Sequence, residues 1–525
     1  MIELAVFIAN ASILALEVVG ARSFTPYFGA SAEVWAGVLA VVLAGLAIGY
    51  HVGGKIADKK NNQNDLRKLL ATTLGASGVV IAITWIVSDS FSILGSSIAA
   101  YSGLTIGASV SAFFLLFPAS ILLAAVSPIA AKMKLHSLEK TASVVGRLSA
   151  IAALGSVAGA FITGIFLIPQ FGSKETLVGV GIALILLAIA LSAPSKRIHL
   201  GIMFFVFIGA LMTSNFFFTS NASGAVNGAL VADIHTRYNR IWVVDSPHAF
   251  GEPFMRTVRT DPSATQCASM MHGELPSDAS ETLTLKYTQA FDVGFNVIPN
   301  PEKILIVGGC NFSYPRHVSN LYPNTVIDVV ELDEGMTKIA KEWFGFVKPN
   351  NMNIYHADGR TFLKNSSQSN PNQYNVIFID AYNSILSIPF QLLTKEAFQV
   401  MEESLAPGGV LVFNLIGTFD GTGRVYLQSV LKTLATTFTH IEILKMREGE
   451  TNVPQNIIIL ATKDDAGKNA VALTVQNKET VTVSEFGLIL KVVSNREELA
   501  RDAIVFTDNY APVETLTKPL RDFRY

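Results

Sequence analysis

Long apolar runs dominate the first part of the chain. A helix needs about 20 mostly apolar residues to cross the hydrocarbon core of a membrane. The runs that predict membrane spans are Ile2–Gly20, Val34–Gly54, Leu69–Val87, Leu104–Ala131, Gly146–Ile168, Thr176–Ala193 and Leu200–Phe218. Pro118 and Pro128 are expected to bend the fourth span. Because Ile93–Lys132 is long for one span, an eighth span or a re-entrant segment stays open. The pattern predicts an all-α polytopic membrane domain over residues 1–220.

After residue 220 the pattern changes to short strand-like runs. Tyr238–Asp245 and Phe254–Thr260 predict a small β region within residues 238–300. Between residues 301 and 525, buried-type strands alternate with helices. The predicted strands are Lys303–Val307, Thr325–Glu331, Asn353–His356, Tyr374–Asp380 and Gly409–Leu415, and a closing antiparallel pair is predicted at Ile441–Met446 and Asn456–Thr462. This alternation predicts an α/β doubly wound, Rossmann-like sheet that binds ligands at the carboxyl ends of its strands.

The distribution of charge supports the same division. Residues 1–220 hold 13 basic and 8 acidic residues, and residues 221–525 hold 26 and 33. Charge density about doubles at the boundary, which indicates a membrane domain followed by a soluble domain over residues 221–525. The net charge of −2 argues against a nucleic-acid binder. No Cys or His pair has metal-ligand spacing, so no metal site is predicted. Of the two cysteines, Cys267 and Cys310, the second is expected to be a small residue that fills a turn.

Polar residues follow four of the predicted strands. Gly308-Gly309 follows the first strand, Glu331 ends the next, and Asp358-Gly359 and Asp380 end the third and fourth. An acid about 20 residues after a glycine turn can accept hydrogen bonds from ribose hydroxyls. The sequence of residues 308–313, Gly-Gly-Cys-Asn-Phe-Ser, lacks the Gly-x-Gly-x-x-Gly pattern of dinucleotide sites. The four positions together predict a site for an adenosine-containing sulfonium nucleoside.

The run from Tyr238 to Phe419 resembles the spermidine synthase (polyamine aminopropyltransferase) family. The membrane half resembles the branch in which this domain is fused to a polytopic membrane domain, and the matching segments are Leu16-Glu17-Val18, residues 45–50 (Gly-Leu-Ala-Ile-Gly-Tyr), Gly53-Gly54-Lys55 and residues 507–514 (Thr-Asp-Asn-Tyr-Ala-Pro-Val-Glu). The resemblance implies a class I methyltransferase/spermidine synthase type of fold. It also implies S-adenosylmethionine or its decarboxylated form as substrate, without a metal, and a polyamine as second substrate. Family members often associate as dimers.

The resemblance assigns a role to each matching position. Tyr287 matches the tyrosine beside the transferred chain, and Asp380 matches the first aspartate of an Asp-x-x-Asp pair that holds amines and accepts the proton. The positions that match nucleoside contacts are Gln266 near the nucleoside, Gly308 and Gly309 in its loop, Glu331 at the ribose, and Asp358 and Gly359 at the adenine.

Three acidic positions of the family pattern are neutral in this chain. Asn311 stands where an aspartate grips the aminopropyl ammonium, Asn383 replaces the second aspartate of the pair, and Thr288-Gln289 replaces an acid after the tyrosine. Each lost carboxylate removes a charge-assisted hydrogen bond of about 1.5–3 kcal/mol. A dicationic diamine would be held poorly, whereas an amide at Asn311 tolerates the carboxylate of intact S-adenosylmethionine. The nucleophile is then an external amine, or the substrate's own carboxylate in a lyase-type reaction that releases 5′-methylthioadenosine.

Two other functions stay open at this point. A methyltransferase would use the same nucleoside fold, and a non-catalytic sensor or transporter would only bind the nucleoside. Product identity separates the methyltransferase from the first function, whereas binding of methylthioadenosine without turnover, with substrate flux in vesicles, would favour the sensor or transporter.

The side of the membrane is a separate question. Basic residues gather in three loops: Lys55, Lys59, Lys60, Arg67 and Lys68 in the first, Lys132, Lys134, Lys140 and Arg147 in the second, and Lys196 and Arg197 in the third. These loops belong in the cytoplasm by the positive-inside rule, and seven spans then place the soluble domain outside. A re-entrant segment would place it inside. Because the substrate is a cytosolic metabolite, we expect a multi-pass protein of the plasma or inner membrane with a cytoplasmic soluble domain. Glu17, in the first span, is either a functional group at membrane depth or the partner of Arg22.

Overall fold

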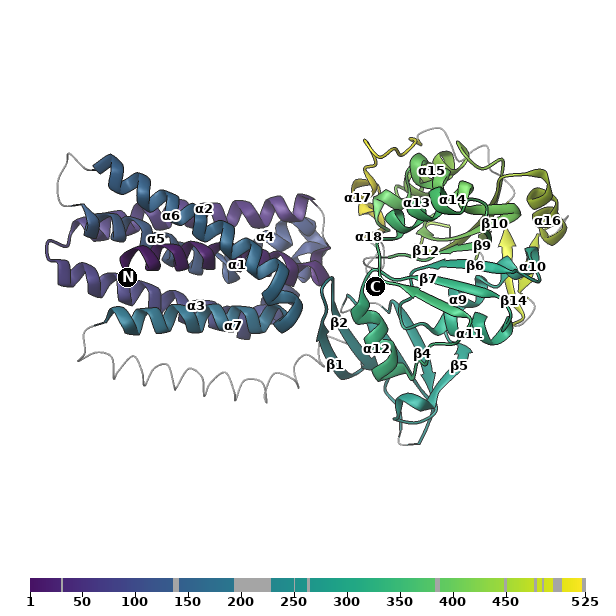
Figure 1. Cartoon of the computed structure of the whole chain (residues 1–525), viewed down its shortest axis with the longest axis horizontal. Helices are drawn as coiled ribbons and strands as arrows, with labels where there is room; N and C mark the ends of the chain where they lie inside the picture. Colours follow the sequence, from purple (N-terminus) through teal and green to yellow (C-terminus); the bar gives the residue numbers. More distant parts are fainter. Residues whose placement is uncertain are drawn as a thin grey trace. The chain divides into compact units, whose positions relative to one another are not determined.

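A computed structural model describes the chain in two compact units (Figure 1). The described residues are all of 1–525 except 30–31, 136–140, 193–227, 250, 262–264, 383–387, 448–450, 476–478, 484–485, 494–502 and 522–525. One unit spans Met1–Asn227 with Ile234–Arg240, and the other spans Gly228–Asp233 with Ile241–Tyr525. The predicted span Leu200–Phe218 lies outside the described residues.

The first unit is built from long apolar helices. They are α1 (Ile2–Phe28), α2 (Ala32–Asp58), α3 (Gln63–Ser102), α4 (Leu104–Leu115), α5 (Phe117–Lys134), α6 (Thr141–Ile162), the π-helix η2 (Thr163–Leu167) and α7 (Ile168–Leu191). Within the described ranges, five helical stretches are long and apolar enough to cross a membrane. The prediction of an amino-terminal helical region with long apolar helices is confirmed.

Three predicted spans are divided differently in the structure. The prediction of one continuous span over Leu104–Ala131 is wrong, because α4 ends and α5 begins around Leu116. Pro118 in the first turn of α5 has no N–H to continue the preceding helix, which explains the break. The spans Gly146–Ile168 and Thr176–Ala193 belong to one helical run that is interrupted at Gly172, where φ is 85° and glycine carries no steric penalty.

Of the two alternatives for Glu17, the ion pair with Arg22 is not seen among the described residues. Arg22 instead donates to the main-chain carbonyls of Thr236, Arg237 and Asn239, all within the first unit. This guanidinium therefore caps a turn of main chain, and a functional role of Glu17 stays a prediction.

The second unit begins with an antiparallel sheet. Its strands follow the order β1 (Ala229–His235), β2 (Arg240–Asp245), β3 (Phe254–Arg259), β4 (Cys267–Met271) and β5 (Ala279–Leu283). The two strands predicted for the small β region are confirmed as β2 and β3. Strands β1, β4 and β5 were not predicted, because their polar and apolar residues do not alternate clearly.

A nine-stranded sheet forms the main body of the second unit. Its strands are β6 (Lys303–Val307), β7 (Val326–Val330), β8 (Met352–Tyr355), β9 (Tyr374–Ile379), β10 (Leu405–Gly417), β11 (His440–Lys445), β12 (Gln455–Thr462), β13 (Thr480–Val483) and β14 (Leu488–Val492). Their spatial order is β13-β14-β11-β12-β10-β9-β6-β7-β8. The pairs from β8 to β10 are parallel, and β12 is antiparallel to both β10 and β11. The doubly wound sheet and its closing antiparallel pair are therefore confirmed.

Helices connect the parallel strands and cover the sheet. They are α11 (Ser313–Leu321), α12 (Glu334–Phe344), α13 (Gly359–Ser369), α14 (Lys395–Ser404) and α15 (Arg424–Leu434). The short helices α9 (Lys286–Ala290) and α10 (Val293–Val297) precede β6, α16 (Asp465–Val475) follows β12, and α17 (Val513–Leu516) and α18 (Lys518–Arg521) lie near the carboxyl terminus.

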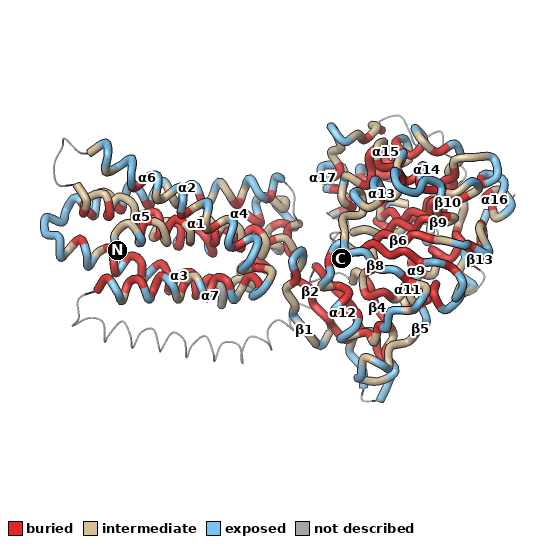
Figure 2. The backbone as a smooth tube through the Cα atoms, viewed as in Figure 1, coloured by how far each residue is buried: buried red, intermediate tan, exposed pale blue. Residues whose placement is uncertain are grey.

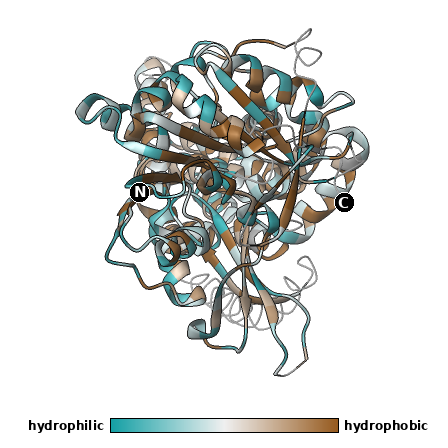
Figure 3. Ribbon diagram, turned by 90° about the vertical axis from the view of Figure 1, so that its right-hand side faces the viewer, coloured by the Kyte–Doolittle hydropathy of each residue, from teal (hydrophilic) through white to brown (hydrophobic). Residues whose placement is uncertain are grey.

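Both faces of the nine-stranded sheet are packed. Separate clusters of buried apolar residues lie against its two faces, and the central strands are buried and hydrophobic along most of their length (Figures 2 and 3). The strand order changes direction between β6 and β9. In open α/β sheets, ligands bind outside the carboxyl ends of the strands at such a switch point.

Candidate functional site

The glycine loop begins directly after β6. Gly308 has φ of 106°, and a Cβ atom there would lie 2.3 Å from the main-chain oxygen of Asp380. Only glycine therefore allows the ends of β6 and β9 to approach this closely. Cys310 and Phe312 also have positive φ angles, of 46° and 59°. The loop turns sharply at the switch point, and its main-chain N–H groups are held by hydrogen bonds within the protein.

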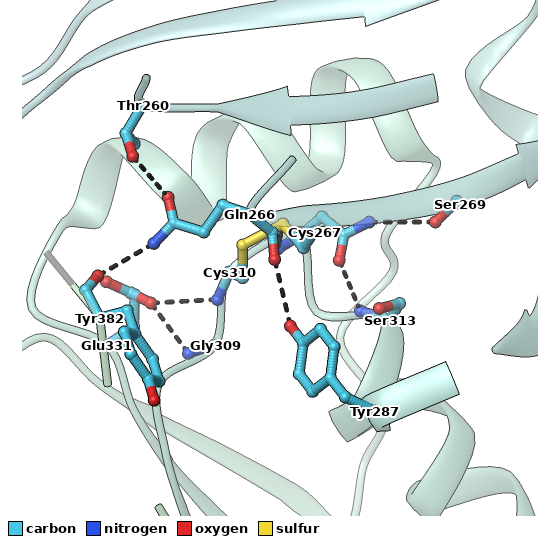
Figure 4. Close-up of a disulfide and its surroundings, with 11 residues drawn as sticks. Thr260, Gln266, Cys267, Ser269, Tyr287, Gly309, Cys310, Ser313, Glu331 and Tyr382 are labelled. Atoms are coloured by element: carbon cyan, nitrogen blue, oxygen red, sulfur yellow. Dashed lines mark hydrogen bonds between the residues drawn. A yellow bond between two sulfur atoms is a disulfide. The ribbon is translucent and has the colours of Figure 1, made fainter. Parts of the chain in front are cut away.

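Glu331, directly after β7, binds this loop through its carboxylate (Figure 4). One oxygen accepts hydrogen bonds from the N–H groups of Gly309 (2.9 Å) and Cys310 (3.1 Å), and the other accepts from the N–H of Asp333 (2.9 Å). Burial raises the pKa of Glu331, and these three donors oppose the rise. The structure thus brings together Gly309 and Glu331, two of the residues predicted to bind the nucleoside.

A disulfide joins Cys310 in the loop to Cys267 at the start of β4 (Figure 4). The Cys267 sulfur also accepts a hydrogen bond from the N–H of Asn311, at 3.2 Å. The prediction that Cys310 only fills a turn is wrong, because its side chain is a covalent link to another sheet. The signal that could have indicated the bond is that the two cysteines neighbour Gln266 and Asn311, both predicted site residues.

Asn311 is engaged at both ends of its amide. Its nitrogen donates to the Ser269 hydroxyl at 3.0 Å, and its oxygen accepts from the N–H of Ser313 at 3.3 Å. Only 3% of Asn311 is exposed. The side chain therefore fixes the loop against β4 and the start of α11.

Asp380, directly after β9, is held by side chains. Its carboxylate accepts a hydrogen bond of 2.9 Å from the amide of Asn414 on β10. Burial raises the pKa of Asp380 to about 6, although hydrogen bonds from Asn414 and Tyr287 lower it. A carboxyl group with this pKa is ionised at neutral pH and can still take up a proton, as a general base requires.

Tyr287 and Gln266 lie beside Asp380. The Tyr287 hydroxyl donates to the main-chain oxygen of Gln266 at 3.1 Å. Burial, together with the charge and hydrogen bond of Asp380, raises the pKa of Tyr287 well above its usual value. The Gln266 amide donates to the main-chain oxygen of Tyr382 at 2.9 Å and accepts from the Thr260 hydroxyl at 3.0 Å (Figure 4). These bonds link the segment after β9 to the antiparallel sheet.

Asp358 and Gly359 lie at the start of α13. Asp358 caps the helix and accepts from the N–H of Thr361 at 2.8 Å and from its hydroxyl at 3.0 Å. A Cβ atom on Gly359 would lie 2.8 Å from a methyl carbon of Val307, so this glycine lets α13 start close to the end of β6. In the described residues the Asp358 carboxylate has a helix-capping role.

Sequence reasoning missed Asn414, Tyr382 and Ser269. The Tyr382 hydroxyl donates to the main-chain oxygen of Asn414 at 3.1 Å and accepts from the N–H of Ile416 at 2.9 Å, which fastens the segment after Asp380 to β10. No motif marks these residues, because their role depends on which strands are neighbours. Asn383 lies outside the described residues. Among the described residues, no group of three or more His, Cys, Asp or Glu side chains could hold a metal.

Residues 288–444 match the family model described as the spermine/spermidine synthase domain. A probable polyamine aminopropyl transferase of Bifidobacterium longum is 29% identical over 230 residues, which are 41% of this chain and 49% of that protein. The chain thus spans about half the length of this relative. A polyamine aminopropyltransferase of Vibrio vulnificus is 26% identical over 222 residues, which are 42% of this chain and 71% of that protein. The human eEF1A lysine and N-terminal methyltransferase is 28% identical over 199 residues, which are 34% and 28% of the two chains.

Solved structures are also similar to this chain. The crystal structure of a probable spermidine synthase from Corynebacterium glutamicum aligns with a TM-score of 0.40 and 19% identity, over 53% of this chain and 97% of that one. The spermidine synthase of Thermotoga maritima aligns with a TM-score of 0.35 and 16% identity, over 56% and 87% of the two chains.

Proposed function

We propose that this protein is a membrane-bound enzyme that acts on sulfonium nucleosides. The proposal starts from a spermidine synthase domain that follows a region of long apolar helices in the chain. The enzyme binds S-adenosylmethionine or its decarboxylated form and cleaves the bond between sulfur and the three-carbon chain, releasing 5′-methylthioadenosine. The observation that carries this proposal is the position of Asp380, whose main-chain oxygen lies against Gly308 while its carboxylate adjoins Tyr287.

The nucleoside would bind along the glycine loop. Gly308 and Gly309 would bring the main chain of the loop close to the ligand, Glu331 would accept bonds from the ribose hydroxyls, and Asp358 with Gly359 would contact the adenine. Glu331 already accepts three N–H groups. The nucleoside therefore meets a carboxylate that is fixed before binding, and little ordering is required.

The reaction is a displacement at the carbon next to sulfur. The lone pair of an amine attacks this carbon, the carbon–sulfur bond breaks, and its electron pair returns to sulfur as a neutral thioether. The amine loses a proton, which Asp380 accepts. Because the leaving group is neutral, in-line geometry matters more than an acid, and Tyr287 would position the chain.

The second substrate is proposed to be less cationic than a diamine. Two of the three neutral positions are described, and neither presents a carboxylate: Asn311 is buried and bonded, and the Gln289 amide donates to the main-chain oxygen of Leu283 at 2.7 Å. Intact S-adenosylmethionine then meets no repelling carboxylate at Asn311. Without an external amine, the substrate's own carboxylate can attack the same carbon, which is the lyase form of the reaction.

The location follows from the same proposal. The apolar helices would hold the enzyme in the plasma or inner membrane as a multi-pass protein, with the lipid bilayer as their partner. A substrate made in the cytosol places the catalytic domain on the cytoplasmic side. Nucleic acid is not a partner on this proposal.

A methyltransferase is the second function, favoured by the similarity to the human eEF1A lysine and N-terminal methyltransferase. Mass spectrometry of the products formed by the purified full chain separates the two. The protein is incubated with S-adenosylmethionine or its decarboxylated form, with and without diamines. We expect 5′-methylthioadenosine, and its formation without any amine identifies the lyase form. S-adenosylhomocysteine with a methylated acceptor would instead establish methyl transfer, and nucleoside binding without turnover would indicate a sensor or transporter.

A further inference from the structure

Asn414 connects the candidate base to a neighbouring strand. Its amide nitrogen donates to Asp380 at 2.9 Å, and its amide oxygen accepts from the side-chain nitrogen of Asn456 at 3.1 Å. Only 2% of Asn414 is exposed. Inside the protein, such a chain of hydrogen bonds is stronger than the same bonds in water.

The register of the sheet explains why the two amides meet. Strands β10 and β12 pair Asn414 with Ile458 and Ile416 with Asn456. Asn414 and Asn456 are therefore diagonal neighbours on one face of an antiparallel pair, within reach of each other.

The donors and acceptors of the three side chains fix the direction in which these hydrogen bonds run, from Asn456 to Asn414 to Asp380. An ionised carboxylate only accepts hydrogen bonds, so Asp380 requires the NH₂ end of the Asn414 amide. The oxygen end of that amide then needs a donor, which Asn456 supplies. Both neighbours thus favour the same orientation of Asn414, and a reversed amide would place its oxygen against the carboxylate.

We propose that Asn414, oriented by Asn456, is a positioning residue that holds Asp380 ionised and in one direction for the reaction. This inference rests on the proposed function of Asp380 as the proton acceptor. Sequence motifs do not assign either asparagine a role, because both act through the strand pairing of β10 and β12.

Among the described residues, the other titratable groups that interact with Asp380 are tyrosines. They are Tyr287, Tyr314 and Tyr382, which come from α9, α11 and the segment after β9. Burial, and secondarily nearby charges, raise the pKa of each hydroxyl well above its usual value, so all three stay neutral near pH 7. A change in the titration of Asp380 can therefore be attributed to the asparagines and not to a second charge among these groups.

The test compares three leucine variants of the full chain. Asn414→Leu removes the donor, and Asn456→Leu removes only the group that orients it. The control is Asn353→Leu, because Asn353 on β8 donates to Asp328 at the same distance of 2.9 Å and lies at an exposed position of the same sheet. Binding of 5′-methylthioadenosine reports whether each variant is folded.

We expect Asn414→Leu to lower kcat roughly tenfold or more at pH 6, with KM within about twofold, and to move the acid limb of the pH profile up by about one unit. Asn456→Leu should move the limb in the same direction by less, and Asn353→Leu should not move it. An equal loss of kcat at every pH, with the limb in place, would show that Asn414 is only structural.

A second readout is independent of activity. In protein labelled with ¹³C-aspartate, the carboxyl resonance that is lost in Asp380→Asn belongs to Asp380, and its titration can be followed directly. If the wild-type protein releases no 5′-methylthioadenosine, the proposed function fails, yet a titration midpoint raised by Asn414→Leu still supports the orienting role. An unchanged midpoint in both Asn414→Leu and Asn456→Leu would overturn it.

Discussion

The two halves of the site are held by different kinds of hydrogen bond. In the glycine-loop half (Gly308–Asn311 with Glu331), the carboxylate accepts three main-chain N–H groups that lie within 22 residues of it. In the Asp380 half (Asp380, Asn414, Tyr287 and Gln266), the carboxylate depends on side chains from other elements. Main-chain donors are present whatever the sequence, whereas side-chain donors can be exchanged one at a time. The glycine-loop half is therefore suited to binding the nucleoside, which is the same in each reaction considered. The Asp380 half is suited to changes in the reaction, because single substitutions there alter the environment of the carboxylate.

The largest effect is expected from Asp380→Asn. The substitution keeps the shape of the side chain and removes the proton acceptor, so release of 5′-methylthioadenosine should fall by about 10²–10⁴-fold. Binding of 5′-methylthioadenosine, measured by calorimetry, should stay nearly constant because the glycine-loop half is unchanged. If instead binding is lost and turnover per bound substrate survives, the division into two halves is wrong.

Glu331→Gln is expected to have a smaller effect, and to lower the affinity for the nucleoside where Asp380→Asn lowers the rate. The variant loses the charge that three N–H groups stabilise, so affinity for 5′-methylthioadenosine should fall about 10–100-fold. The rate of the bound complex should change little. Glu334→Gln is the matched control, because Glu334 is an exposed residue whose ion pair with Lys338 on α12 contributes little. Equal losses in both variants would argue that Glu331 has no special place in binding.

The pH dependence tests the protonation of Asp380 without a mutation. Below about pH 6 the Asp380 carboxylate takes up a proton, so kcat/KM should fall about tenfold per pH unit. The folded-state pKa lies above that of the unfolded chain, so the contribution of Asp380 to stability is present below the unfolded pKa and lost as pH rises through about 6. Activity and this part of stability should therefore change in opposite directions, and Asp380→Asn should remove the stability difference. Parallel changes would contradict the assignment.

The smallest effect on the chemistry is expected from loss of the bond between Cys267 and Cys310. It closes a separation of 43 residues, and its removal should lower the free energy of unfolding by about 2–4 kcal/mol. Affinity for 5′-methylthioadenosine should fall because the loop is less restrained, while the titration of Asp380 should not change. Thermal unfolding of the wild type with reductant and of Cys267→Ser/Cys310→Ser should agree. A shifted Asp380 titration would show that the two halves are mechanically coupled.

The same division explains what the sequence could predict. Gly308, Glu331, Asp358 and Asp380 follow predicted strands, and the carboxyl ends of parallel strands meet at one edge, so their grouping follows from local pattern. Asn414 and Asn456 depend on the register of β10 against β12, which no local pattern specifies. Cys267 begins β4 of the antiparallel sheet and Cys310 lies in the loop after β6 of the nine-stranded sheet, so their pairing required the tertiary fold.

The amino-terminal helical unit shows a related difference. Apolar length predicted where long helices lie, because a run of about 20 apolar residues is the length that a membrane-crossing helix needs. It did not separate α4 from α5, where Pro118 was expected only to bend one span, and it did not predict the interruption at Gly172, since both breaks are decided by single residues within apolar sequence. Arg22 bonds main-chain carbonyls far along the chain, and charge spacing alone had suggested Glu17.

The redox state of Cys267 and Cys310 depends on the compartment that the domain faces. Cytoplasmic thiols are kept reduced by glutathione and thioredoxin, whereas disulfides persist in the periplasm and outside the cell. A domain facing the cytoplasm would carry Cys267 and Cys310 as thiols and a looser glycine loop, and a domain on the far side would carry the closed bridge. Only free thiols are alkylated, so alkylation of these two residues in intact cells reports on which side of the bilayer the domain lies. The same disulfide determines how tightly the glycine loop is held.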